Sequence, residues 1–184
     1  MKKLYANLED LIISNLNFVE SNKDRLLFEK INVASEKKYL TKTEFYEICM
    51  WKSPRPKKYY LMNTEETIEN ISSIILSTID EKIKIDLLDS LKGVSIPTAS
   101  AILTLINPRD YGIIDIRVWQ VLYLYGYVNE KSSGINFSFD NWLNYLTKLR
   151  RYANKYNITA RTVEQILFKH HLKIQEGKLY DKKL

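Results

Sequence analysis

The chain has 184 residues and a formal net charge of +6 at pH 7, and its 45% apolar and 27% charged residues are typical of a globular protein. Its lone cysteine, Cys49, excludes an intramolecular disulfide and any four-cysteine zinc or iron–sulfur site. The positive charge permits nucleic-acid binding, and a lysine-rich proteome explains it equally well. Because no apolar run reaches transmembrane length and no signal-peptide core follows the start, we expect a cytoplasmic protein with no membrane partner.

Apolar residues recur at helical spacing through the first half of the chain. One such stripe predicts a first helix and consists of Leu8, Leu11, Ile12, Leu16 and Val19. Thr41 and Glu44 have the spacing of a capping box. The helix that they open should stop before Pro54, since the residue before a proline disfavours helical backbone. Asn63 with Glu66 has the same spacing and predicts the start of a further helix.

The second half of the chain continues the helical pattern. Asp80 is expected to cap a helix that Gly93 breaks, residues 98–106 form a short apolar helix, and Asp115 opens another. A polar loop over residues 129–136 then precedes a strongly amphipathic run. The apolar positions of that run are Trp142, Tyr145, Leu146, Leu149 and Tyr152.

Thr159 is expected to cap the last helix, which contains the adjacent residues His170 and His171. Adjacent residues do not share a helix face and the chain has no other histidine, so we expect a solvated or nucleic-acid-facing pair rather than a metal site. No strand-like alternation rivals the helical signals. The sequence therefore predicts an all-α bundle of about eight to ten helices. It would form a single domain over residues 1–184, in which two lobes could flank a cleft.

Residues 91–103 have the pattern of two helices joined by a tight turn. Gly93 permits the reversal, a new helix begins near Ser95 or Ile96, and Pro97 suits the first turn of that helix, where a missing amide hydrogen costs nothing. Amides of the turn and of the helix start then point outward together, which makes an anion site for a DNA phosphate. The alternative is an ordinary helix–turn–helix packing element.

Asp115 follows this turn and is either a helix N-cap or a catalytic carboxylate. Together they resemble the helix-hairpin-helix–Gly/Pro-Asp superfamily of DNA glycosylases, relatives of endonuclease III and adenine glycosylase, with the hairpin at residues 88–106. The family pattern is Leu-x-Gly-Val-Gly-x-x-Thr-Ala-x-x-x-Leu, a Gly/Pro loop, and an aspartate that opens a helix. The matching residues are Leu91, Gly93, Val94, Thr98, Ala99, Leu103, Pro108, Gly112 and Asp115. Residues 51–55, 99–103 and 149–167 are also similar to a little-characterised bacterial branch of the superfamily.

The resemblance implies monofunctional removal of a damaged or unusual base from double-stranded DNA, by hydrolysis of the N-glycosidic bond. Asp115 would stabilise the positive charge that develops on the sugar and orient the attacking water. Arg117 would hold a phosphate or pair with an acid. The hairpin residues that would contact DNA are Lys92, Gly93, Val94, Ser95, Ile96, Pro97 and Thr98. Two rival functions stay open: a non-catalytic DNA-binding protein on the same scaffold, and a helical interaction module that never contacts DNA.

Three departures from the family pattern bear on that chemistry. Ser95 replaces the second glycine of the hairpin. Pro97 stands where bifunctional members carry the lysine that forms a Schiff base, which excludes lyase chemistry through that position. Arg117 replaces a histidine that often follows the aspartate. The iron–sulfur cysteines are absent, so we expect no cofactor beyond a monovalent cation that the hairpin could bind.

A basic and aromatic segment begins at the end of the helix that precedes Pro54. Trp51, Lys52 and Arg55 are its candidate pocket or DNA-facing residues, because interleaved bases and aromatics suit stacking and phosphate contact. The alternative is a solvated loop in which Trp51 anchors the helix end in the core. Lys52 is also an alternative catalytic amine, which would restore lyase activity despite Pro97.

Overall fold

The computed structural model describes residues 1–177 and 179, apart from the side chains at positions 23 and 32–35. Within those residues it contains ten α-helices and no strand, which confirms the predicted all-α class and helix number. In chain order the helices are α1 (Leu8–Ile13), α2 (Asn22–Lys37), α3 (Lys42–Lys52), α4 (Lys57–Tyr60), α5 (Glu65–Ser77), α6 (Glu81–Asp89), α7 (Ile96–Ile106), α8 (Ile116–Leu124), α9 (Phe139–Tyr156) and α10 (Ala160–Ile174). No helix in this part of the chain is both long and apolar enough to cross a membrane.

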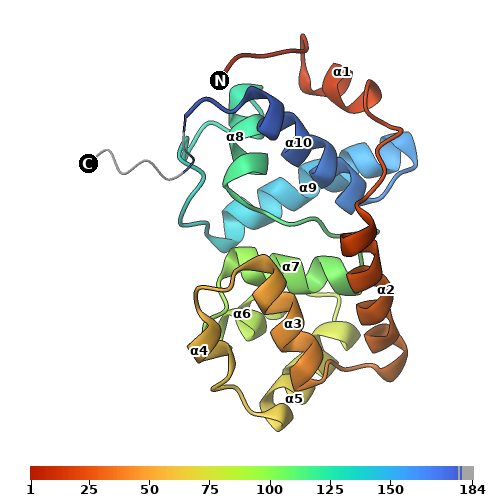
Figure 1. Cartoon of the computed structure of the whole chain (residues 1–184), viewed down its shortest axis with the longest axis vertical. Coiled ribbons are helices and arrows are strands. Elements are labelled where there is room, and N and C mark those ends of the chain that lie inside the picture. The colour runs from red at the N-terminus through yellow and green to blue at the C-terminus, as the bar shows by residue number, and fades with distance from the viewer. Residues whose placement is uncertain (178, 180–184) are drawn as a thin grey trace.

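The helices form two groups, one above the other in Figure 1. In the lower group α7 lies at the centre and packs against α2, α3 and α6, while α5 packs on α6. In the upper group α10 packs against α8, α9 and α1. The largest fully buried side chains belong to both groups, with Phe45 and Tyr60 in one and Trp119 and Trp142 in the other. The lower group is thus the continuous segment from α2 to α7, whereas the upper group brings α1 together with α8, α9 and α10.

Four of the predicted helix starts are confirmed because each depends on a short-range hydrogen bond. Thr41 and Glu44 form the predicted capping box of α3, which ends at Lys52, before Pro54. Asp80 accepts from two backbone amides at the start of α6. Asp115 caps α8 and Thr159 caps α10 in the same way. These caps satisfy amide groups that have no partner inside the helix.

Two predicted helix bounds are wrong. The stripe that runs to Val19 was expected to be one helix, but α1 ends at Ile13 and Val19 is 84% exposed. Asn15 explains the early end, because its side chain donates to Leu11 O at 2.8 Å and so competes with continued helix. Asn63 is not the cap of α5: Thr64 fills that position, and its hydroxyl accepts from the backbone amide three residues later.

Two helices, α2 and α4, had no counterpart in the sequence prediction. In α2 only Phe28 and Ile31 are buried among the apolar side chains described, and Leu26 is exposed. This leaves too short a stripe to indicate a helix by periodicity. Helix α4 has four residues, which is less than two turns. Helix α2 packs against α7, and helix α4 packs against α3. This tertiary packing accounts for both helices.

Candidate functional site

A cleft of about 880 Å³ opens where the two groups of helices face each other. Its walls come from the end of α3 with the loop that follows, the start of α7, the start of α8, residues 134–137 and the first half of α10. Most of the residues singled out in the sequence line it, although they are far apart along the chain. They are Trp51, Lys52, Arg55, Ser95, Ile96, Pro97, Thr98, Asp115 and Arg117.

Asp115 uses its two carboxylate oxygens for different purposes. Oδ1 accepts hydrogen bonds from Arg117 N at 2.9 Å and from Val118 N at 3.1 Å, which caps α8. Oδ2 lies 3.5 Å from Nζ of Lys52. The side chain is 23% exposed and lies at the cleft wall. The capping role and the presence of a carboxylate in the cleft are therefore compatible.

Lys52 and Trp51 reach the cleft from the last turn of α3. The Lys52 side chain is 16% exposed, so its ammonium group is sheltered beside Asp115. Trp51 donates from Nε1 to Asp24 Oδ1 at 3.0 Å, and its ring lies edge-on to Phe28. The ring of Trp51 therefore packs against the core at Phe28 and also lines the cleft. Arg55 is exposed at the cleft edge.

The turn between α6 and α7 divides the predicted hairpin residues into two sets. Of the described residues, those from Ser95 to Thr98 line the cleft, whereas Lys92, Gly93 and Val94 do not. Gly93 has φ +85°, and a Cβ atom there would lie 2.9 Å from Cβ of Tyr59. Val94 is buried. The first three residues of the turn therefore shape it, and the next four face the cleft.

Ser95 is the N-cap of α7 and has extended backbone, with φ −130° and ψ 169°. Any residue adopts that conformation, so a glycine is not required at this position. The first intrahelical hydrogen bond runs from Ala99 N to Ser95 O at 2.8 Å. The N–H groups of Ile96 and Thr98 precede it, and Pro97 has none to offer. The start of α7 thus presents two backbone donors where it lines the cleft.

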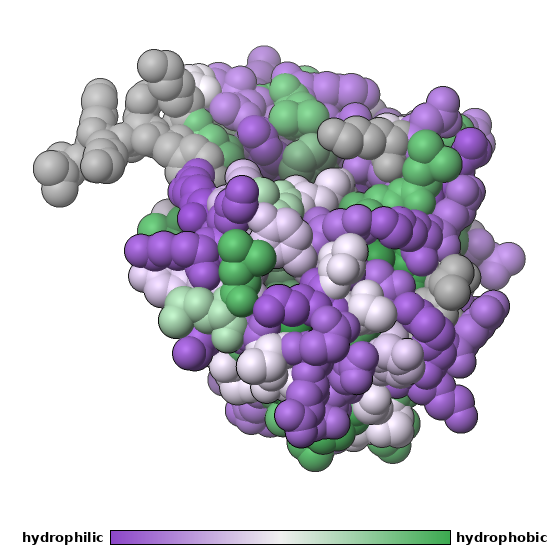
Figure 2. Space-filling view, turned by 60° about the horizontal axis from the view of Figure 1, so that its bottom comes forward, coloured by the Kyte–Doolittle hydropathy of each residue, from purple (hydrophilic) through white to green (hydrophobic). Residues whose placement is uncertain are grey.

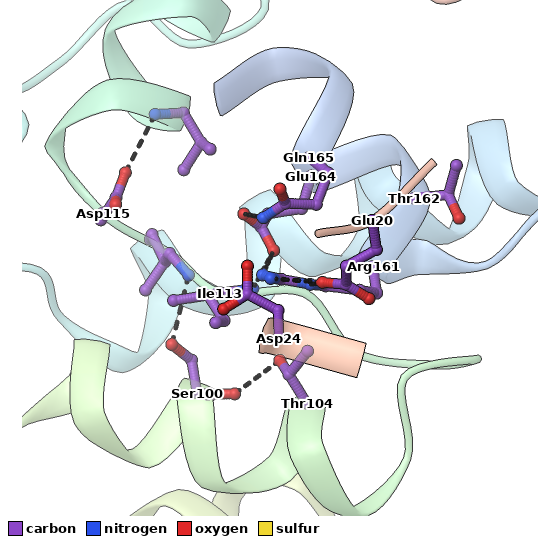
Figure 3. A network of polar contacts seen from close by, with 12 residues as sticks. Glu20, Asp24, Ser100, Thr104, Ile113, Asp115, Arg161, Thr162, Glu164 and Gln165 are labelled. Carbon is purple, nitrogen blue, oxygen red and sulfur yellow. Dashed lines mark hydrogen bonds and ion pairs between the residues drawn. The ribbon is translucent and has the colours of Figure 1, made fainter. Parts of the chain in front are cut away.

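Sequence reasoning missed a buried polar group on α10, formed by Arg161, Glu164 and Gln165 (Figure 3). Arg161 forms ion pairs with Glu20 and with Glu164. Glu164 also accepts from Gln165 Nε2 at 3.1 Å and from Ile113 N at 3.4 Å. All three α10 residues line the cleft. The i,i+3 spacing of Arg161 and Glu164 was the one sequence signal for a pair.

Burial raises the pKa of Glu164, while Arg161 opposes this shift and Asp115 adds to it. The electrostatic effect of Asp115 on Glu164 indicates that the two carboxylates belong to one charged cluster. Lys52 lowers the pKa of Glu164 and so acts on the same cluster. The cleft therefore contains an ionic network in which cations from α3 and α10 offset carboxylates from α8 and α10.

The predicted solvated pair His170–His171 is wrong, since both side chains are buried. His171 Nε2 contacts Gln120 Oε1 at 2.8 Å, and its Nδ1 contacts Arg117 Nη1 at 3.2 Å. Because arginine only donates and the amide oxygen only accepts, a neutral imidazole with its proton on Nε2 satisfies both contacts. Burial, followed by the charge of Arg117, lowers the pKa of His171 to about 4. The imidazole therefore positions the Arg117 guanidinium at the cleft.

Among the described residues, no group of three or more His, Cys, Asp or Glu side chains could hold a metal ion. Comparison of the chain with protein-family models, curated proteins and solved structures yields no match.

Proposed function

We propose that the chain is a DNA N-glycosylase of the helix-hairpin-helix–Gly/Pro-Asp type, which releases a modified base by hydrolysis. The observation that carries this proposal is the position of Asp115, whose carboxylate lies in the same cleft as the start of α7. A carboxylate and a phosphate-binding helix start, held at one cleft, are the two parts that the reaction needs.

The chemistry assigns a separate task to each part. A base inside a duplex must leave the stack before it can be attacked, and the cleft of about 880 Å³ is large enough to admit a flipped nucleotide. Cleavage of the glycosidic bond builds positive charge on the sugar, which the ionised Asp115 would stabilise. Its Oδ2, which does not cap α8, would also orient or deprotonate the attacking water.

DNA docking would use groups on both sides of the cleft. The amides of Ile96 and Thr98 at the start of α7 would hold a backbone phosphate without reading sequence. Arg55 and Arg117 supply positive charge at the same opening. Trp51 offers an aromatic face for stacking. On the face shown in Figure 2, hydrophilic side chains predominate and hydrophobic ones are scattered, which favours this reading over an apolar interaction module.

The substitution Asp115→Asn tests the proposal. Asparagine caps helices as well as aspartate does, so α8 should stay intact while the charge is lost. We expect base release from a panel of lesion-bearing duplexes to fall by about 100-fold or more, with DNA affinity retained. Asp80→Asn is the matched control, because Asp80 caps another nine-residue helix and does not line the cleft.

Two results would contradict the proposed glycosylase activity. The first is a wild-type protein that binds duplex DNA but releases no base from a broad lesion panel. The second is unchanged release by Asp115→Asn. If the wild type shows no reaction and Asp115→Asn keeps the DNA affinity of the wild type, the chain is a non-catalytic DNA-binding protein on this scaffold. Failure to bind DNA at low salt would favour the interaction module instead.

A further inference from the structure

A second cavity, of about 450 Å³, lies where α9 ends and α10 begins. Its walls come from the loop after α7, the last part of α9 and the turn into α10. None of the described residues lines both this cavity and the cleft. A recess of this volume lies in the size range of small-molecule sites. It is therefore a separate candidate for ligand binding.

Arg150 is held in position at the wall of this cavity. Its Nε donates to Asp110 O at 2.9 Å, and its Nη2 pairs with Glu81 Oε1 at 2.6 Å. The guanidinium carbon also lies 4.9 Å from the centroid of the Tyr111 ring. Nη1 takes part in neither hydrogen bond, and the side chain is 33% exposed. A guanidinium group fixed in this way loses little conformational freedom when it binds a ligand.

Arg109 provides a second guanidinium group at the same cavity. Its side chain is exposed and forms no ion pair with the described residues. Its backbone is fixed, because Arg109 O accepts from Ala160 N at 2.9 Å. Asn154 and Asn157 add exposed side-chain amides, each of which can donate two hydrogen bonds. The cavity thus collects hydrogen-bond donors from two different segments of the chain.

The described lining of the cavity has an excess of positive charge. Asp110 provides its one carboxylate, and Asp110 Oδ2 accepts from Asn107 Nδ2 at 2.8 Å, whereas the lining contains two guanidinium groups. The start of α10 is not needed as an anion site, since its first two amides already donate to the carbonyl oxygens of Arg109 and Pro108. The side chains therefore decide the ligand, and they suit an anion with several acceptor oxygens.

We propose that this cavity binds the phosphate group of a free phosphomonoester of nucleotide size. Such a group presents three acceptor oxygens and a charge of about −1.5 to −2 at pH 7, and arginine binds it through paired N–H groups. Ala153 and Ile158 form the apolar part of the lining and would contact the organic part of the ligand. A free molecule is favoured over a DNA strand because the cavity shares no described lining residue with the cleft. This site goes beyond the proposed function and does not depend on it, since it takes a different ligand at a different place.

Nuclear magnetic resonance of the isotope-labelled full chain tests this site. Inorganic phosphate and deoxyadenosine monophosphate are the probes, and sodium chloride at matched ionic strength is the reference. We expect each probe to shift the side-chain Nε–H signals of Arg109 and Arg150 in a saturable manner, while chloride does not. Arg109→Gln should weaken phosphate binding by about 10-fold or more, because it removes charge-assisted hydrogen bonds.

Arg151→Gln is the matched control, because Arg151 is an exposed arginine next to Arg150 that does not line the cavity. This variant should bind phosphate as the wild type does. Arg150→Lys keeps the positive charge but loses the fork of N–H groups, so it should bind phosphate more weakly than the wild type. Unchanged signals in the rest of the spectrum would verify that each variant is folded.

Several outcomes would overturn the site: no saturable shift with either probe, equal shifts with chloride, or equal affinity in wild type and Arg109→Gln. Shifts that only duplex DNA produces would also overturn it, since they would assign the cavity to a nucleic-acid strand. The wild-type titration decides the first two outcomes whatever a substitution does to folding. Phosphate binding without base release would contradict only the proposed glycosylase, and base release without phosphate binding would contradict only this site.

Discussion

Asn63 pairs with both backbone polar groups of Lys92. Its Oδ1 accepts from Lys92 N at 2.8 Å, and its Nδ2 donates to Lys92 O at 3.1 Å and to Tyr60 O at 3.0 Å. The Asn63 side chain is buried, and it lies 29 positions before the residue that it holds. The turn that leads into α7 is therefore shaped by the loop after α4 as well as by its own residues.

Asn63→Ala should lower the free energy of unfolding by about 1–3 kcal/mol, because it removes the buried amide that pairs with both backbone polar groups of Lys92. Urea unfolding measures the loss. Asn15→Ala is the control, since Asn15 makes its hydrogen bonds to Leu11 and Tyr5, in the other group of helices. Equal losses in the two variants would show that the Asn63 contacts to the turn have no special weight.

Gly93→Ala should destabilise the protein more than Gly126→Ala does. Both glycines have positive φ, +85° and +78°, so each substitution carries a similar backbone strain of about 1 kcal/mol. At Gly93 the new Cβ would also meet Tyr59 Cβ at 2.9 Å and Tyr60 Cδ1 at 3.0 Å, whereas nothing lies within 4 Å at Gly126. The difference between the two midpoints of thermal unfolding isolates the steric part. Indistinguishable midpoints would mean that the tyrosines move aside without cost.

The free energy of unfolding should depend on pH through His171. Its pKa is lowered from 6.5 to about 4 in the folded protein, so the unfolded chain takes up a proton first as the pH falls. Stability from this group is complete above about pH 6.5 and is lost toward pH 4, by up to about 3 kcal/mol. Denaturant titrations across this range measure the slope. The slope should decrease in His171→Gln, and an unchanged slope would assign the dependence to other groups.

Salt dependence should reveal a phosphate contact by Arg55, which is exposed at the edge of the cleft. Arg55→Ala should weaken duplex binding at every salt concentration and reduce the slope of log affinity against log salt by about 1. Fluorescence anisotropy with a labelled duplex provides the measurement. Arg25→Ala is the control, because Arg25 is an exposed arginine of α2 outside the cleft. A slope that changes equally in both variants would place the DNA elsewhere.

Features that depend on a few neighbouring residues were predictable from the sequence. The caps formed by Thr41, Asp80, Asp115 and Thr159 each need only a side-chain oxygen and an amide two or three positions away. Asn63 shows the limit of such patterns. Its spacing to Glu66 matches a capping box, but its side chain binds Lys92 instead, and nothing within a few residues of Asn63 indicates that partner.

The sequence by itself determined the helical class, the capped starts of four helices, the tight turn at Gly93 and the carboxylate that opens α8, because helix periodicity and capping are local. Only the tertiary structure decided that Asp115 lies 3.5 Å from Lys52, a residue 63 positions away, and that both face the start of α7 across one cleft. It also decided that His171 and the Arg161–Glu164 pair are buried. Those outcomes depend on which helices pack together and exclude water, and packing between distant segments has no signature in the local order of residues.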